Sequence, residues 1–295
     1  MSIPSAYLGV ILIWSTTPLA IKWSGEAGHF VFGASGRMTL GAFVCLLIMI
    51  LLRVEFPWHS AARRSYLAAS VAIYGAMIGV YWGAQFIPSG LISVLFGLTP
   101  IITSLLAAIW LREHSLSVHK WIGMLLGLFG LALIFKTNLG TNTQAVKGLL
   151  AVLVSVCLHS ASAVWVKRIN VTISPLAMTC GGLLMALPFY GCTWILLGET
   201  LPSNLSTRTL WSIAYLGVFG SVIGYVLYYY ILKHLETARV ALITLITPIS
   251  ALIIGQTVNG EIIPLTVWLG AGVVLSGLGI YQWGQNLREW IADSG

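Results

Sequence analysis

The sequence predicts an all-α membrane protein in which ten transmembrane helices form two inverted five-helix repeats around a central cavity. Three observations lead to this class. Hydrophobic residues make up 58% of the 295 residues and charged residues only 8%, whereas soluble domains carry about 25% charged residues. The apolar residues gather in long continuous runs, and the second half of the chain repeats a pattern of the first half. A surface with so little charge is suited to lipid rather than to water.

The apolar runs predict the membrane spans. A helix needs about 18 apolar residues or more, nearly free of charge, to cross the hydrocarbon core of a bilayer. Ten runs meet this description, and the first begins almost at the N-terminus without the cationic start of a cleavable signal peptide. The predicted spans are residues 4–24, 30–52, 66–87, 89–111, 118–136, 148–168, 175–197, 209–232, 237–258 and 264–287.

Two segments half a chain apart carry the repeat. Residues 95–113 and 243–261 align without a gap, so that a Thr-Pro pair falls on a Thr-Pro pair and Glu113 falls on Glu261. A period this long is not that of a solenoid. Five spans per half is an odd number, so the second half must enter the membrane in the opposite orientation. Such inverted repeats are typical of secondary transporters, which bind their substrates between the halves near the midplane.

The polar stretch at 137–147 divides the chain into two predicted units, residues 1–140 with spans one to five and residues 141–295 with spans six to ten. The formal net charge is +7, but the cations lie at the ends of the spans and form no patch for nucleic acid. Ten Lys and Arg residues fall on the side of the N-terminus and four on the other side. The positive-inside rule therefore predicts a bacterial inner-membrane protein with both termini in the cytoplasm.

Several of these features occur together in one known family. The five-plus-five arrangement, the Thr-Pro pairs of spans four and nine, Trp14, Ser15 and Lys22 in span one, and Arg37 in span two resemble the drug/metabolite transporter superfamily. The likeness is greatest to its EamA-type ten-helix exporters, which include amino-acid exporters, and it covers nearly the whole chain. It implies a cavity lined by spans one, three, four, six, eight and nine that opens alternately to the two sides of the membrane.

Polar and aromatic side chains inside the spans are the candidate cavity residues, because each costs free energy when it faces lipid. Aromatic rings in a cavity offer stacking and cation–π contacts, although rings near span ends also form interfacial belts. His159 replaces Trp14 in the second half and either hydrogen-bonds within the bundle or contacts a ligand or proton. The predicted substrate-binding set is Trp14, Tyr81, Trp82, Gln85, His159, Trp165, Tyr229 and Gln256.

Four further residues have two possible roles each. Pro100 and Pro248 are predicted hinges, since a proline inside a span frees a backbone carbonyl, and the alternative is a packing kink. Arg37 has no acidic neighbour in the sequence and must find a carboxylate, helix carbonyls or a substrate anion. Lys22 lies near a span end, where it either contributes to the site or extends to the interface.

The interiors of the predicted spans contain no Asp or Glu. The small four-helix multidrug members of the superfamily exchange protons for cations at a membrane-embedded glutamate, and this sequence departs from them there. It also lacks a P-loop and any pair of histidines at metal-ligand spacing within a span. No enzymatic activity, cofactor, metal or nucleic-acid partner is expected.

The predicted function is secondary transport across the inner membrane by alternating access. The expected cargo is a small zwitterionic metabolite, amino acids above all, moving outward. The alternative is efflux of drugs or apolar cationic toxic compounds. The expected partners are the small-molecule substrate and the lipid bilayer, and a monomer is the default because ten helices can enclose a cavity alone.

Overall fold

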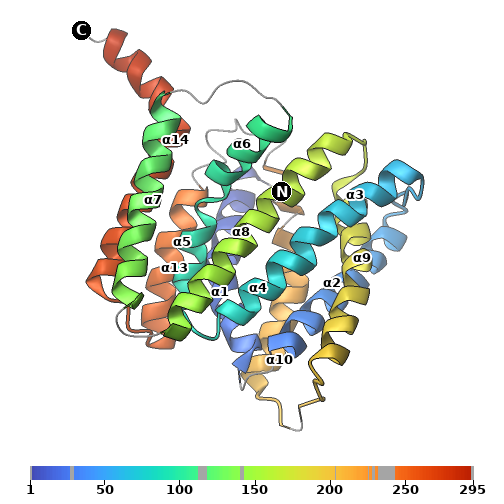
Figure 1. The fold of residues 1–295 in the computed structure, drawn as a ribbon. Coiled ribbons are helices and arrows are strands. Elements are labelled where there is room, and N and C mark those ends of the chain that lie inside the picture. The colour runs from blue at the N-terminus through green and yellow to red at the C-terminus, as the bar shows by residue number, and fades with distance from the viewer. Residues whose placement is uncertain are drawn as a thin grey trace.

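The computed structural model shows a bundle of helices that cross one another at varied angles (Figure 1). It describes residues 2–26, 30–111, 118–139, 143–202, 204–224, 226–227, 230–231 and 243–293, with only the backbone for 137–139 and 285–293. Within these ranges there is no strand. Eight helices of this part of the chain are long and apolar enough to cross a membrane.

The first half supplies five of the predicted spans and the second half the other five. Span three consists of three consecutive helices, and spans four and eight of two each. In order, the first half comprises α1 (Ile3–Ser24), α2 (Phe30–Leu51), α3 (Ser60–Ser70), η2 (Val71–Ala76), α4 (Met77–Gly83), α5 (Ser89–Phe96), α6 (Thr99–Trp110) and α7 (Val118–Leu139). The second half comprises α8 (Thr143–Ile169), α9 (Pro175–Leu196), α10 (Thr207–Tyr215), η3 (Leu216–Ile223), α13 (Ile243–Asn259) and α14 (Leu265–Asp293).

Capping residues set several helix starts. The Ser174 hydroxyl accepts from the backbone N–H of Ala177 at the start of α9, and the helix opens with proline, whose missing N–H costs nothing there. His59 caps α3 in the same way, through Nδ1 and the N–H of Ala62 at 3.3 Å. Span three therefore begins six residues before the predicted start at residue 66, because a capped polar turn precedes its apolar run.

Spans three and eight share an irregular stretch. The π-helical segments η2 and η3 lie at matching places in the two repeats. π-Helical turns are rare in proteins and occur often at functional sites. Their presence at equivalent positions shows that the repeats share local distortions as well as helix order.

Two glycine contacts show how the halves are related. A Cβ on Gly123 of α7 would stand 2.5 Å from the carbonyl oxygen of Gly277 of α14, and a Cβ on Gly130 would stand 2.6 Å from that of Gly270. In the repeat alignment Gly123 corresponds to Gly270 and Gly130 to Gly277. A two-fold rotation that exchanges the two repeats therefore converts each of these contacts into the other. Residue numbers rise along α7 while they fall along α14, so the helices are antiparallel and the axis is perpendicular to them. The halves are inverted repeats.

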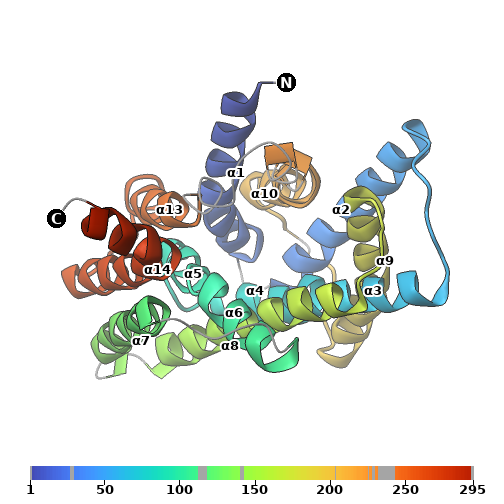
Figure 2. The same cartoon turned by 90° about the horizontal axis from the view of Figure 1, so that it is seen from above.

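The other major helix contacts follow the same exchange. Helix α2 packs against its repeat counterpart α9, and α5 packs against its counterpart α13. Helix α1 packs against α10 as α8 packs against α3. Likewise, η3 packs against α2 as η2 packs against α9. Helices α7 and α14 lie side by side at one edge of the bundle, while α2, α3 and α9 form the opposite edge (Figures 1 and 2). The predicted fold class of ten helices in two inverted repeats is confirmed.

Candidate functional site

One end of the bundle is joined by a set of polar side chains, the Glu261 cluster (Lys22, Trp23, Ser89, Asn259 and Glu261). Lys22 Nζ lies 3.2 Å from Glu261 Oε1, and the backbone N–H and hydroxyl of Ser89 donate to Glu261 Oε2 at 2.8 and 3.1 Å. Asn259 Nδ2 donates to Glu261 Oε1 at 3.0 Å and its Oδ1 accepts from Trp23 Nε1 at 2.8 Å. The Glu261 side chain is only 5% exposed, and its charge is fully paired, as burial requires.

The cluster joins the end of α1 to the beginning of α5 and the segment after α13. Gly255 makes room for it, since a Cβ at this position would stand 2.6 Å from Glu261 Oε2. Beside the cluster, Arg208 of α10 forms an ion pair with Glu26 at 2.6 Å and lies over the Trp23 ring at 5.4 Å. Four spans are therefore tied together at this end of the molecule.

Arg37 of α2 is a buried cation inside the helix, and only 6% of this residue is exposed. Its Nε donates to the hydroxyl of Ser221 in η3 at 3.0 Å. Its Nη1 has no hydrogen-bond partner among the residues that the structure describes, and no ion pair joins it to any carboxylate of those residues. Incompletely paired charge inside a membrane span is costly and marks a functional position.

A tyrosine of span seven lies near this charge and contacts span three. Tyr190 of α9 interacts electrostatically with Arg37, Tyr81 and Tyr74, and its hydroxyl donates to the carbonyl of Ile73 at 2.7 Å. The Tyr74 and Tyr190 rings meet edge to face at 5.0 Å. Tyr81 of α4 is 1% exposed, and its hydroxyl lacks a hydrogen-bond partner within the described ranges. A polar interior therefore exists where spans two, three, seven and eight meet.

Trp14 packs inside the bundle. It is half-buried on α1, and its Nε1 would lie 3.4 Å from a Cβ placed on Gly224 at the end of η3. Around it is a small apolar cluster with the buried residues Ala6, Val10, Ile231 and Ile243. The ring thus sits where spans one, eight and nine converge, and its role in lining a cavity stays a prediction.

His159 of α8 lies against Phe96 of α5, with ring centroids 5.7 Å apart. Its Nδ1 is buried with no hydrogen-bond partner in the part of the chain that is described. The hydroxyl of the neighbouring Ser160 is also buried without a hydrogen-bond partner among the described residues. The same holds for Ser15, its counterpart in the first repeat. Spans one and six therefore carry matching hydroxyls with unused hydrogen-bonding capacity.

The two predicted hinges differ in conformation. Between α5 and α6 the helix is interrupted, and Thr99 and Pro100 begin the new helix. Pro248, in contrast, lies inside the continuous α13, where the Thr247 hydroxyl donates to the carbonyl of Ile243 at 2.9 Å. The repeats thus share the sequence but not the bend, and hinge motion itself stays a prediction.

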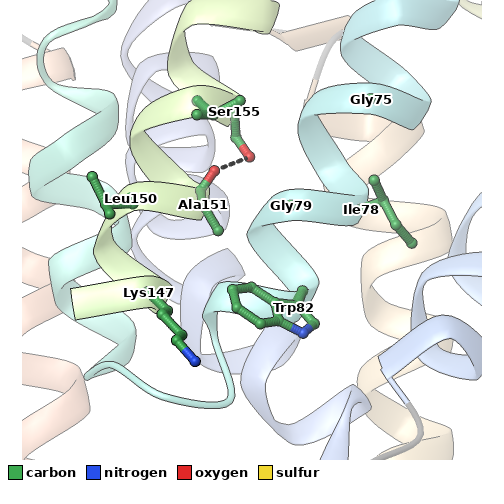
Figure 3. Close-up of a pocket in the computed structure, with 9 residues that line it drawn as sticks. Gly75, Ile78, Gly79, Trp82, Lys147, Leu150, Ala151 and Ser155 are labelled. Carbon is green, nitrogen blue, oxygen red and sulfur yellow. Dashed lines mark hydrogen bonds between the residues drawn. The ribbon is translucent and has the colours of Figure 1, made fainter. Parts of the chain in front are cut away.

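Trp82 lines an open groove of about 400 Å³ between α4 and α8 (Figure 3). Lys147 lies at one end of this groove, next to the Trp82 ring, and the other lining residues are almost all apolar. Leu150 and Val154, which are 48% and 57% exposed, also line it. The groove is therefore a surface feature between two neighbouring spans and not the predicted central cavity.

Gln85 needs a correction, because it lies outside the helix in which the sequence placed it. Helix α4 ends at Gly83, and Gln85 occupies the exposed turn that follows, where its Nε2 donates to the carbonyl of Trp82 at 3.2 Å. The reason is Pro88, since a proline disfavours helical conformation in the residue before it. The span therefore ends earlier than the apolar run.

Two further predicted residues lie on the exposed surface of the bundle. Trp165 of α8 is 41% exposed, and Gln256 is exposed on α13. Tyr229 lies outside the described residues. Sequence reasoning missed Tyr190 and Ser221, and it named Lys22 and Glu261 without pairing them, since these contacts join distant spans. The signal that pointed to the polar interior was the lone Arg37 in an apolar run.

Comparisons with known proteins agree with this architecture. A model of the EamA-like transporter family matches residues 3–136 and again residues 146–281. An uncharacterized transporter of Bacillus subtilis, YoaV, is 26% identical over 92% of this chain and 93% of its own length. The Escherichia coli protein YedA, described as an uncharacterized inner membrane transporter, is 24% identical over 96% of this chain and 91% of its own.

A solved crystal structure shares the fold, with a TM-score of 0.64 and 17% identity over 95% of this chain and 96% of that one. The family model matches nearly the whole chain, one copy in each half. Together with the named relatives, it indicates a membrane transporter and not an enzyme. This chain belongs to the EamA-like transporter family, within the drug/metabolite transporter superfamily that its Thr-Pro repeat and Arg37 resemble.

Proposed function

We propose that this transporter exports small zwitterionic metabolites, amino acids first among them, from the bacterial cytoplasm by alternating access. It acts as a monomer in the inner membrane with both termini in the cytoplasm. The solute accumulated inside the cell supplies the driving force, so no coupling ion is required. The family membership supports transport, and the interior of the bundle supports the class of cargo.

The position of the acidic residues is the observation that carries this proposal. Every carboxylate whose side chain the structure describes lies at a helix end or in a connection, namely Glu26, Glu55, Glu199 and Glu261. An apolar cation held near the midplane would need an acidic partner there. A zwitterion brings its own countercharge and requires hydrogen-bonding groups, which Tyr81, His159 and the buried serines provide.

The Glu261 cluster supports alternating access. It joins spans one, four and nine at the end of the bundle that the charge distribution assigns to the outside. An exporter must open this end to release its cargo and close it again. A few polar contacts between helix ends are suited to such a step, because they form and break as a unit, unlike a packed apolar core.

Efflux from living cells tests the proposal. Cells that overproduce the protein and cells without it are loaded with dipeptides, and the amino acids appearing in the medium are measured over time. In parallel, growth is followed in ethidium and in a quaternary amine. Faster release of one or more amino acids with unchanged tolerance of the toxic cations is expected. Increased tolerance with unchanged release would replace the proposal with cation efflux.

A further inference from the structure

Arg37 offers more hydrogen bonds than its surroundings accept. A guanidinium carries five N–H donors, and the hydrogen bond to Ser221 engages only Nε. Nη1 is buried and has no acceptor within the described part of the chain. Tyr81 adds a second buried group with spare capacity, its hydroxyl. Arg37, Tyr81, Tyr190 and Ser221 are called the Arg37 cluster below.

The guanidinium lies between two of the spans that are predicted to line the cavity. A Cβ on Gly220 of η3 would stand 3.5 Å from Arg37 Nη2 and 3.8 Å from the hydroxyl of Thr17 on α1. Tyr81 belongs to α4 and interacts with Tyr190, as Arg37 does. The guanidinium thus lies beside spans one and eight and is buried inside the bundle, rather than turned toward lipid.

The chemistry of the cluster selects a ligand class. Guanidinium binds carboxylate in a planar two-pronged geometry, and a tyrosine hydroxyl can donate to the same oxygens. Arg37 is the only cation that acts on Tyr190 among the described residues. A single positive charge matches a singly charged carboxylate, whereas a phosphate monoester would leave negative charge uncompensated in a low-dielectric interior.

We infer that the Arg37 cluster binds the carboxylate of the transported solute, with Arg37 and Tyr81 as its donors. This inference rests on the proposed function. It adds which residues recognise the carboxylate of the zwitterion. It also accounts for a cation inside a span with no countercharge among the described residues, because the cargo supplies that charge during part of the cycle. An amino acid fits this requirement and its amide does not.

Binding to the purified protein tests the inference. Wild type and variants in detergent are titrated with L-amino acids and with the matching amino-acid amides, and the shift in melting temperature and the tryptophan fluorescence report binding. The wild type should prefer the acid over the amide by about tenfold or more, the equivalent of one hydrogen bond to a charged group. Arg37→Gln should abolish this preference, and Arg37→Lys should keep part of it.

Tyr81→Phe gives a second, milder variant in case Arg37→Gln fails to fold. It should weaken binding of the acid about tenfold, the loss of one hydrogen bond to a charged group, and leave binding of the amide unchanged. Tyr281→Phe is the matched control, because Tyr281 is buried on α14 in another part of the bundle, and it should behave as wild type.

Two results overturn the inference in different ways. Equal binding of acid and amide by the wild type, or an unchanged preference in Tyr81→Phe, would remove the carboxylate role and leave the proposed export of amino acids intact. Absence of binding by both sets of compounds to the folded wild type would contradict the proposed function itself, and the inference with it.

Discussion

Arg37 and Glu261 are both buried charges, yet their surroundings differ. Glu261 receives hydrogen bonds from Ser89 and Asn259 and an ion pair from Lys22. Arg37 donates from Nε to the neutral Ser221 hydroxyl, and its buried Nη1 has no partner among the residues that the structure describes. A buried ion is stable only when it is paired and hydrogen-bonded. Glu261 therefore belongs to a complete structural contact, while Arg37 keeps capacity for a ligand.

Trp14→Ala should reduce export strongly while the protein still inserts in the membrane. The half-buried ring packs where three spans converge, beside Gly224, and its removal leaves a gap that costs about 1–3 kcal/mol of stability. Amino-acid release and membrane abundance are measured together. Trp211→Ala is the control, because Trp211 is 71% exposed on α10. Equal release by both variants and wild type would show that Trp14 has no role in transport.

The site was only partly predictable at the residue scale. An arginine in an apolar span and a tyrosine deep in another are visible in sequence, so Arg37 and Tyr81 were singled out. Their partners were not, since Ser221 is 184 positions from Arg37 and only packing brings them together. Gln85 was misplaced because hydropathy alone does not show that Pro88 ends the helix early.

At the scale of elements, the repeat predicts matching spans but not matching bends. The interruption between α5 and α6 contains Gly97, and the corresponding position in α13 is Leu245. Glycine costs about 1 kcal/mol in a helix interior and leucine very little. A glycine two positions before the Thr-Pro pair therefore accounts for a break in span four, whereas α13 runs through Pro248. Because the Thr-Pro pairs are identical, the repeat alignment alone did not predict that only span four is interrupted.

The packing of α7 on α14 depends on glycines and gives a sharp stability prediction. A Cβ on Gly277 would stand 2.7 Å from the carbonyl oxygen of Gly123 and 2.9 Å from the N atom of Gly127. Gly277→Ala should therefore destabilise the protein by about 1–3 kcal/mol through overpacking. Gly279→Ala on the same helix meets nothing within 4 Å and should leave stability unchanged or raise it by up to about 1 kcal/mol, because alanine favours the helix. Thermal unfolding in detergent compares them, and equal melting temperatures would refute this packing.

At the scale of the whole molecule, the sequence predicted the number of spans and their inversion well. Long apolar runs reflect contact of the helices with lipid, so hydropathy identifies the spans. An odd number of spans per repeat forces the two repeats into opposite orientations in the membrane. The glycine contacts between α7 and α14 then showed the two-fold relation. Helix distortions such as η2 and η3 were not predicted, because they arise from packing between spans and leave no periodic signal.

In the repeat alignment Glu113 corresponds to Glu261 and Lys167 to Lys22, and we therefore predict a counterpart of the Glu261 cluster at the opposite end. Glu113 lies outside the described residues. Removing one partner of a buried ion pair costs about 3–5 kcal/mol. Glu261→Gln should therefore favour opening at the Lys22 end, and Glu113→Gln should favour opening at the other.

A reporter cysteine at the buried Ser15, in a background without the four native cysteines, measures this bias. An impermeant maleimide is applied to right-side-out and to inverted membrane vesicles. Glu261→Gln should speed labelling from one side and Glu113→Gln from the other. A change in the same direction for both variants would contradict symmetric closure of the two ends.

Counterflow in proteoliposomes tests the central claim most directly, because it requires both a binding site and alternating access. Vesicles containing the purified protein are filled with one unlabelled amino acid at a time and diluted into a trace of the same radiolabelled compound. The account predicts transient, saturable accumulation of label for at least one amino acid, lost in Arg37→Gln and retained in Tyr281→Phe. No accumulation of any amino acid, with counterflow of a quaternary amine in the same vesicles, would contradict it.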